Sequence, residues 1–284
     1  MTTPPPDGSR DRRIEDPSNR WLIHPAARAL LPIAVRLRVS ANAVSLSGLA
    51  LGIGAAFAYA HWTSPVAAAL GLLLSVGWLV ADGLDGMIAR ATNTASALGR
   101  FLDGVCDHAV FVLIYVALAL SIGTVEGWAL AVAAGVAHAV QSSLYEGERT
   151  RFHRRLKGVA EVDAPPPSDN PLVRGYDAIA GSVGRLARPF EVTLATSSRP
   201  DHLGRDYAAA AVAPMRLLSL LSANVRVWAI FAACVGGHPV FFWLFEVAPL
   251  TVVAAIGLVW HRRVEQRFVA PSASRRGKSP SSYA

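Results

Sequence analysis

Four aspartates stand close together in "VADGLDGMIARATNTASALGRFLDGVCDHAV", residues 80–110, a segment with long apolar flanks. They are Asp82, Asp85, Asp103 and Asp107. Carboxylates in apolar membrane surroundings are costly and mark a functional site. Because four negative charges in a confined place repel one another, a cation is expected among them.

The neighbouring residues suggest what the cation holds. Carboxylate oxygens suit Mg²⁺ or Mn²⁺, and such sites leave coordination positions open for phosphate oxygens. Arg90 adds a planar guanidinium suited to phosphate. Gly83, Gly86 and Gly99 leave room for a ligand, although glycine in membrane helices more often serves helix packing. These residues predict a metal-bound diphosphate.

The composition predicts an integral membrane protein, since 52% of the residues are hydrophobic and only 17% are charged. The formal charge of +7 comes without a basic stripe interleaved with aromatics, so we expect no nucleic-acid partner. Cys106 and Cys234 lie in apolar runs, as small buried hydrophobes do, and no disulfide framework is implied.

The pattern predicts an all-α, polytopic protein, since spanning a membrane takes about 20 predominantly apolar residues. Six stretches qualify, near residues 44–62, 66–91, 96–121, 125–147, 208–234 and 238–260. The turns "HWTSP", "IGTVEG" and "VGGHP" contain no Lys or Arg, whereas the other side holds nearly all of them. By the positive-inside rule both termini and the aspartates are expected to face the cytoplasm. We expect the membrane to be a bacterial inner membrane.

Two interfacial amphipathic helices complete the predicted architecture. The first lies in "RWLIHPAARALLPIAVRLR", where Pro25 and Pro32 argue against a single straight helix. In the second, apolar residues recur at helical spacing from Leu172 to Leu186, and the helix is expected to stop before Pro189. The predicted parts are a disordered tail (1–19), an interfacial segment (20–43), the membrane domain (44–262) with its cytoplasmic loop (148–207), and a basic tail (263–284).

Helical spacing gathers the aspartates. Asp82 and Asp85 share one face of the second span, and Asp103 and Asp107 share one face of the third. Folding these spans back about the turn "TNTA" brings Asp82 level with Asp107 and Asp85 level with Asp103. All four carboxylates should then meet in the cytoplasmic half of the bundle.

These residues carry a family resemblance. Their spacing matches the signature D-x2-D-G-x2-A-R-x8-G-x3-D-x3-D of the CDP-alcohol phosphotransferases at all eight positions: Asp82, Asp85, Gly86, Ala89, Arg90, Gly99, Asp103 and Asp107. Upstream, "VSANAVSLSG" is similar to the family's P-N-x-x-T segment, with Ala41 for the proline and Ser45 for the threonine.

The resemblance implies transfer of a substituted phosphoryl group from a CDP-linked donor to an alcohol, with release of CMP. Asp82, Asp85 and Asp103 would be ligands of two Mg²⁺ or Mn²⁺ ions, and Asp107 would complete the cluster and act as general base. The CDP moiety would lie against Asn42, Ser45, Asp85, Gly86, Ala89, Arg90 and Gly99. The resemblance also implies a homodimer, for which "GLALGIGAA" offers small residues.

Three functions remain open. The first is a phosphatidyltransferase that uses CDP-diacylglycerol and a small alcohol. The second is an enzyme that uses a soluble CDP-aminoalcohol and a lipid alcohol such as diacylglycerol or ceramide. The segment "ARATNTASALGRFLDGVCD" resembles this choline and ethanolamine phosphotransferase branch of the family. The third, a cation transporter, leaves the Gly, Ala and Arg spacing unexplained. We expect the first, because a small chain of six spans with this signature is most often of that kind.

Residues outside the signature have two interpretations. His138, Gln141 and Tyr145 could line the acceptor site, but polar residues that bridge helices are at least as common. His108 points off the face of Asp107 and is expected to be structural. The basic cluster 149–155 could steer an anionic acceptor, yet such clusters usually follow from topology.

Arg226 and Glu246 are charges that the signature does not explain. Arg226 lies eight residues before Cys234 and Glu246 lies eight residues after His238, on either side of the turn "VGGHP", so antiparallel helices would carry them at equal depth. Since an unpaired charge there is costly, the spacing predicts a structural ion pair, with phosphate binding by Arg226 as the alternative.

Overall fold

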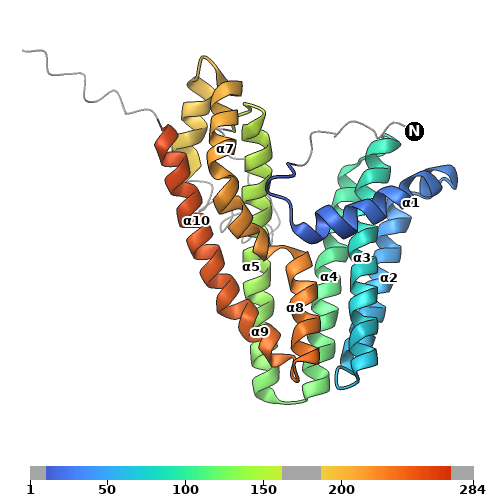
Figure 1. Cartoon of the computed structure of the whole chain (residues 1–284). Coiled ribbons are helices and arrows are strands. Elements are labelled where there is room, and N and C mark those ends of the chain that lie inside the picture. Colours follow the sequence, from blue (N-terminus) through green and yellow to red (C-terminus); the bar gives the residue numbers. More distant parts are fainter. Residues whose placement is uncertain (1–10, 162–186, 270–284) are drawn as a thin grey trace, which may run out of the picture. The chain divides into compact units, whose positions relative to one another are not determined.

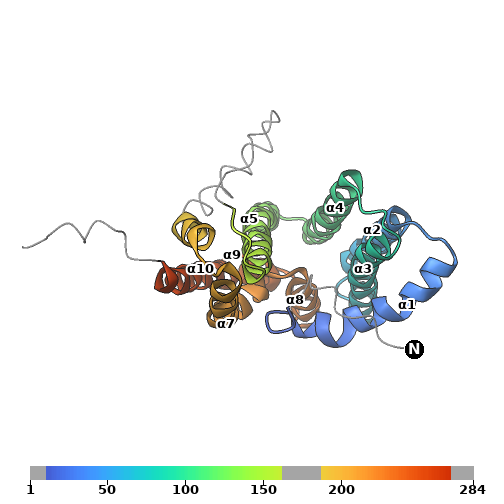
Figure 2. The same cartoon turned by 90° about the horizontal axis from the view of Figure 1, so that it is seen from above.

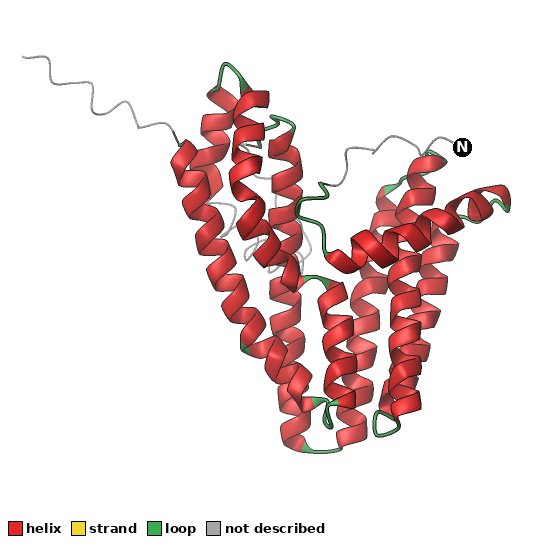
Figure 3. Cartoon of the chain, viewed as in Figure 1, coloured by secondary structure: helices red, strands yellow, loops and turns green. Residues whose placement is uncertain are grey.

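The computed structural model describes residues 11–161 and 187–269, without the side chains of 97, 98 and 100–103 (Figure 1). Within these ranges the regular elements are helices and no strand occurs, which confirms the all-α prediction for this part of the chain (Figure 3). Contacts divide the chain into two compact units. The first comprises Met1–Tyr145 and Arg216–Ile256, and the second Glu146–Met215 and Gly257–Ala284.

Serine caps begin three consecutive helices, of which the second and third carry the signature. These helices are α2 (Ala41–Ala60), α3 (Pro65–Ala91) and α4 (Ala97–Ile122). Ser40, Ser64 and Ser96 each precede one of them, and each hydroxyl accepts a hydrogen bond from the backbone N–H three residues on. Such caps satisfy donors that a helix start leaves unpaired.

The remaining elements are helices of different lengths. They are the π-helical turn Asn19–Ile23, α1 (His24–Arg36), α5 (Val125–Leu156), α7 (Pro200–Leu218), a 3₁₀ turn (Ser219–Leu221), α8 (Ala223–Val235), α9 (Val240–Val247) and α10 (Pro249–Phe268). Residues 187–196 are also helical.

Four helical segments of the described chain are long and apolar enough to cross a membrane: Ala41–Tyr59, Pro65–Ala91, Gly104–Ile122 and Val240–Phe268. A fifth is obtained if α7, the 3₁₀ turn and α8 form one broken span. The predicted span 125–147 is helical but too polar to qualify, since Glu126, His138 and Gln141 lie in it. A multi-pass membrane protein is supported, while the count of six remains a prediction.

The three turns without Lys or Arg lie together at one end of the first unit, as Figure 1 shows. The indole N–H of Trp62, after α2, donates to Ser121 Oγ near the end of α4 over 3.1 Å. The Trp62 ring also contacts the His238 ring, between α8 and α9, with centroids 5.1 Å apart. The predicted alternation of helix direction is therefore confirmed within this unit.

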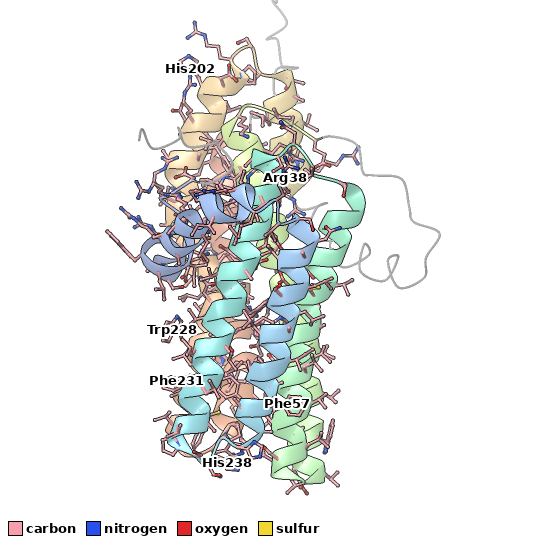
Figure 4. All side chains as sticks on the ribbon, turned by 90° about the vertical axis from the view of Figure 1, so that its right-hand side faces the viewer. Arg38, Phe57, His202, Trp228, Phe231 and His238 are labelled. Atoms are coloured by element: carbon pink, nitrogen blue, oxygen red, sulfur yellow. The ribbon has the colours of Figure 1, made fainter. Side chains whose placement is uncertain are left out.

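Large apolar side chains cover the outer flanks of α2, α3 and α4. Phe57 is 70% exposed and Leu73 is 67% exposed. Figure 4 shows Phe57 on such a flank, between Arg38 near one end of the unit and His238 at the other. Exposed apolar surface on this scale is expected where lipid is the solvent.

Close packing of α2 depends on glycine. A Cβ at Gly48 would lie 3.3 Å from Ala81 Cβ on α3, and one at Gly52 would lie within 3.0 Å of three Val110 side-chain atoms on α4. The small residues of "GLALGIGAA" thus serve packing inside the chain, so they do not by themselves argue for a dimer interface.

Gly52→Ala is therefore expected to destabilise the protein by about 1–3 kcal/mol, because a methyl group has no room against the branched side chain of Val110. Thermal unfolding in detergent measures the effect. Val110→Ala should restore part of the loss in the double variant. Gly104→Ala on α4 is the control, since a Cβ there meets nothing within 4 Å. An unchanged midpoint for Gly52→Ala would contradict the packing.

Helix α1 differs from the predicted interrupted segment, because it continues through Pro32. Pro25 occupies the first turn, where a missing N–H costs nothing. Figures 1 and 2 show α1 running across α3 rather than along it. Ala27 is buried against α3, whereas Ile33 is 56% exposed. Whether α1 lies on a membrane surface remains a prediction.

The predicted N-terminal tail makes contacts from residue 11 onward. Arg216 Nε donates to the Arg13 carbonyl over 2.6 Å, and Asn224 Nδ2 donates to the buried carboxylate of Asp16 over 3.3 Å. The predicted fifth span is broken near Ser222, whose extended ψ of 157° separates the 3₁₀ turn from α8. The predicted stretch 208–234 is thus not one continuous helix.

In the second unit, the predicted surface helix over 172–186 lies outside the described residues. Its predicted end before Pro189 was wrong, since residues 187–196 are helical across that proline. Proline removes one N–H but its fixed φ suits a helix. Phe190 and Leu194 anchor this helix and are 1% and 0% exposed.

Candidate active site

Helix α2 fixes the height of the aspartates on α3. Ser45 Oγ donates a hydrogen bond of 2.6 Å to Asp85 Oδ2, and Asp85 is 5% exposed. One turn further along α2, Gly48 packs on Ala81. Asp82, between these two contacts on α3, therefore lies level with the stretch of α2 from Ser45 to Gly48.

The same helix fixes the height of α4. At one end, Asn42 Oδ1 lies 3.5 Å from where a Cβ would stand at Gly99, and at the other Gly52 packs on Val110. Asp107 precedes Val110 by three residues, so it falls less than one turn from Gly52 along α2. The structure thus places the α3 and α4 parts of the signature within about 15 Å along one helix.

Asp107 is tied to α3 by a tryptophan. Trp78 Nε1 donates to Asp107 Oδ1 over 3.2 Å, and the Trp78 ring meets the Phe111 ring edge-on with centroids 5.3 Å apart. The side chain of Asp103 is not among those described, although its backbone continues α4 between Gly99 and Asp107. Its predicted place beside Asp85 stays a prediction.

The glycines in and beside the signature have different neighbours. A Cβ at Gly86 would lie 3.3 Å from Arg90 Nη1, so the guanidinium of the exposed Arg90 covers that position. Gly83 follows the packing interpretation, because it faces α1, where a Cβ would contact Ala27 Cβ at 3.7 Å. Ala89, which lies between Gly86 and Arg90 in the sequence, is partly buried.

His138 and Gln141 belong to a buried polar network in the first unit. Gln141 accepts from Arg226 Nη2 over 2.8 Å and donates to the Glu246 carbonyl over 3.0 Å. His138 Nδ1 lies 3.3 Å from the Tyr115 hydroxyl. Gln141 therefore bridges helices, as the structural interpretation expected.

The predicted ion pair between Arg226 and Glu246 is confirmed. Arg226 Nη2 lies 2.9 Å from Glu246 Oε1, and both side chains are fully buried. Arg226 Nη1 also donates to the carbonyl of Leu221, in the last turn before the break at Ser222. The guanidinium thus satisfies backbone that the broken helix frees.

Three further side chains behave as expected. His108 is exposed, and its Nδ1 lies 2.7 Å from the Gly104 carbonyl one turn earlier, which fits a structural role. Cys106 and Cys234 are buried, at 4% and 3% exposure, and neither is in a disulfide among the described residues. Tyr145 is buried as well, at 5% exposure.

The second unit contains a different cluster of possible metal ligands. Glu148, His261 and Glu265 offer ligand atoms within 4.8 Å of one another. However, the guanidinium of Arg262 donates to both carboxylates, and Arg155 pairs with Glu265 as well. Guanidinium groups thus occupy the place where a cation would bind, so we interpret this cluster as an ion-pair network.

The network lowers the pKa of Glu148 from its ordinary value of 4.5 to about 2. Burial alone would raise it, but the hydrogen bond from His261 and the charges of Arg262, His261 and Arg151 outweigh burial. The stabilisation should therefore be complete above pH 4.5 and be lost as the pH falls towards 2. Its magnitude is on the order of 3 kcal/mol.

Thermal unfolding in detergent between pH 7 and pH 3 tests this. The unfolding temperature of the wild type should decrease once the pH is below 4.5. Glu148→Gln should unfold at a lower temperature than the wild type at pH 7, and its unfolding temperature should decrease less on acidification. Glu126→Gln, at an exposed position of the same helix, should follow the wild type. Parallel profiles for the wild type and Glu148→Gln would contradict the assignment.

Trp78 is the residue of this site that the sequence analysis missed. It precedes Asp82 by four residues and therefore lies on the same helical face, a spacing that could have indicated it. Ser45 was predicted to approach the nucleotide, and the structure adds its hydrogen bond to Asp85.

Comparison with known proteins agrees with the signature. Residues 38–153 match the family model described as CDP-alcohol phosphatidyltransferase. No curated protein and no solved structure matches the chain. The matched stretch runs from just before α2 into α5 and contains all eight signature positions. Residues 38–153 are thus similar to the CDP-alcohol phosphatidyltransferase family, which supports the resemblance seen in the signature.

Proposed function

We propose that the protein transfers a phosphatidyl group from CDP-diacylglycerol to a small alcohol and releases CMP. The acceptor oxygen forms a bond to the phosphorus that carries diacylglycerol. The bond from that phosphorus to the bridging oxygen breaks, and CMP leaves with the electron pair. The hydroxyl proton goes to the carboxylate of Asp107. The family match and the apolar helices support a membrane phosphotransferase.

The observation that carries the proposal is the shared register on α2. Ser45 holds Asp85 on α3, while Gly52 sets the height of Asp107 on α4. A diphosphate bound beside the stretch of α2 from Ser45 to Gly52 would be near carboxylates from both α3 and α4. A general base within hydrogen-bond reach of the acceptor is what such a transfer needs.

The donor set fits a divalent cation. Asp82 and Asp85 on α3 and Asp107 on α4 supply oxygen atoms only, which Mg²⁺ and Mn²⁺ prefer over nitrogen or sulfur. Asp82, Asp85 and Asp103 would hold two such ions, with Asp107 completing the cluster. Bound ions would neutralise the diphosphate and stabilise the departing CMP.

The nucleotide would lie beside the same stretch of α2. Arg90 is exposed and its guanidinium can reach a phosphate that approaches Gly86. The residues assigned to the CDP moiety are Asn42, Ser45, Asp85, Gly86, Ala89, Arg90 and Gly99. Their end of the first unit is the one that carries Arg38, opposite the turns without Lys or Arg (Figure 4).

We place that end in the cytoplasm, since positive charge is retained there. Both termini and the active site would then be cytoplasmic, in a bacterial inner membrane. The family resemblance further implies a homodimer, which cross-linking in native membranes tests. The predicted division into an interfacial segment, a membrane domain with a cytoplasmic loop, and two tails belongs to the same proposal.

The deciding experiment incubates purified protein with Mg²⁺ or Mn²⁺ and follows CMP release. CDP-diacylglycerol is paired with a panel of small alcohols, and CDP-choline or CDP-ethanolamine with diacylglycerol or ceramide. Turnover with CDP-diacylglycerol supports the proposal, and turnover only with a soluble CDP-aminoalcohol reverses the roles of donor and acceptor. A chelator should abolish turnover. Cation transport without CMP release would overturn the proposal.

A further inference from the structure

We propose that Trp78 is a positioning residue for the transfer reaction, because its indole N–H donates a hydrogen bond to Oδ1 of Asp107 and so orients this carboxylate. The inference rests on the proposed role of Asp107 as general base. Indole nitrogen is a donor only, so it can orient the carboxylate but cannot take the proton.

The hydrogen bond restrains the carboxylate. Trp78 Nε1 lies 3.2 Å from Asp107 Oδ1, and Trp78 is 2% exposed whereas Asp107 is only partly buried. A hydrogen bond to a charged acceptor is stronger than one between neutral groups. One oxygen of Asp107 is thus held from the protein interior, while the residue keeps a solvent-accessible part.

The indole itself is fixed by its neighbours. On α4, the Phe111 ring meets it edge-on at a centroid distance of 5.3 Å and an interplanar angle of 84°. On α2, a Cβ at Gly48 would lie only 3.4 Å from Trp78 Cδ1. A donor that packing holds in place needs no reorganisation when the reaction occurs, which is the property of an effective catalytic dipole.

A second buried tryptophan in the same unit supplies the contrast. Trp243 on α9 is 0% exposed, and its indole N–H has no hydrogen-bond partner among the described residues. Packing alone therefore accommodates a tryptophan in this core without such a bond. Trp78 differs in that its N–H reaches a carboxylate of the signature.

The test compares Trp78→Phe with Trp243→Phe. Both remove an indole N–H and a similar volume from a buried site, but only the first removes a hydrogen bond to a carboxylate. Trp78→Phe should lower kcat by about 10- to 100-fold, with KM for the CDP-linked donor within about twofold. Trp243→Phe should keep kcat near the wild-type value even if its thermal midpoint falls.

The Asp107→Asn background separates positioning from a general loss of structure. If Trp78 acts through the carboxylate, Trp78→Phe should reduce the residual rate of Asp107→Asn by less than about twofold. A loss as large as in the wild-type background, or equal losses in Trp78→Phe and Trp243→Phe, would overturn the inference. So would wild-type kcat in Trp78→Phe.

Failure of the proposed function is recognised separately. If wild-type protein releases no CMP with any substrate pair, the function is wrong, and the hydrogen bond is judged by NMR of indole ¹⁵N–¹H groups in detergent. The resonance that disappears in Trp78→Phe should shift in Asp107→Ala and stay in place in Glu126→Gln. An unmoved resonance in Asp107→Ala overturns the contact on which the inference depends.

Discussion

Asp107→Asn is expected to slow CMP release by about 10²- to 10⁴-fold, because the variant lacks the carboxylate that accepts the hydroxyl proton. The amide has the same shape, and its oxygen can still accept the hydrogen bond from Trp78. The remaining aspartates, Asp82, Asp85 and Asp103, can still hold metal. Binding of the CDP-linked donor, measured by calorimetry, should therefore change little.

Two comparisons make the result specific. His108→Gln alters the adjacent, exposed residue, and it should retain turnover, which excludes that imidazole as the base. Asp82→Asn should instead raise the metal concentration needed for half-maximal activity. Near wild-type turnover in Asp107→Asn would show that the proton leaves by another route and that the assignment is wrong.

Arg226→Gln is expected to lower the free energy of unfolding by about 3–5 kcal/mol, because it leaves Glu246 buried without its cationic partner. Both side chains are 0% exposed, so solvent cannot replace the lost interaction. The variant also loses the contacts of the guanidinium with Gln141 and the Leu221 carbonyl. Thermal unfolding in detergent measures the loss.

The double variant Arg226→Gln, Glu246→Gln tests the pairing. Removing both charges should restore part of the stability, since the second substitution eliminates the unpaired carboxylate. Arg36→Gln, at an exposed position on α1, is the control and should unfold like the wild type. If Arg226→Gln lost turnover at unchanged stability and without rescue, Arg226 would belong to the active site.

Local patterns were sufficient for the features that depend on helical period and chain reversal. The apolar stretches predicted the ranges of α2, α3 and α4, and the spacing around "VGGHP" predicted the pair of Arg226 and Glu246. The signature itself is a pattern of residue types at fixed offsets. These features need only the rise and twist of a helix and a short turn between neighbours.

The sequence alone could not decide which helix faces which. Gly83 and Gly86 look equivalent in the signature segment, yet one packs against α1 and the other against Arg90. The broken helix at Ser222 and the hydrogen bond from Trp78 to Asp107 were likewise not predicted. Helical period fixes the face on which a residue lies, but its contacts depend on partners far away in the chain.

The clearest example is the pair of polar clusters. Four aspartates spaced along two helices were recognisable as a candidate site, because their offsets in the sequence are enough to predict it. Glu148, His261 and Glu265 were not recognised, since more than 100 residues separate Glu148 from the other two. Only the folded chain shows that Arg262 lies between those carboxylates, and this position makes the cluster an ion-pair network rather than a metal site.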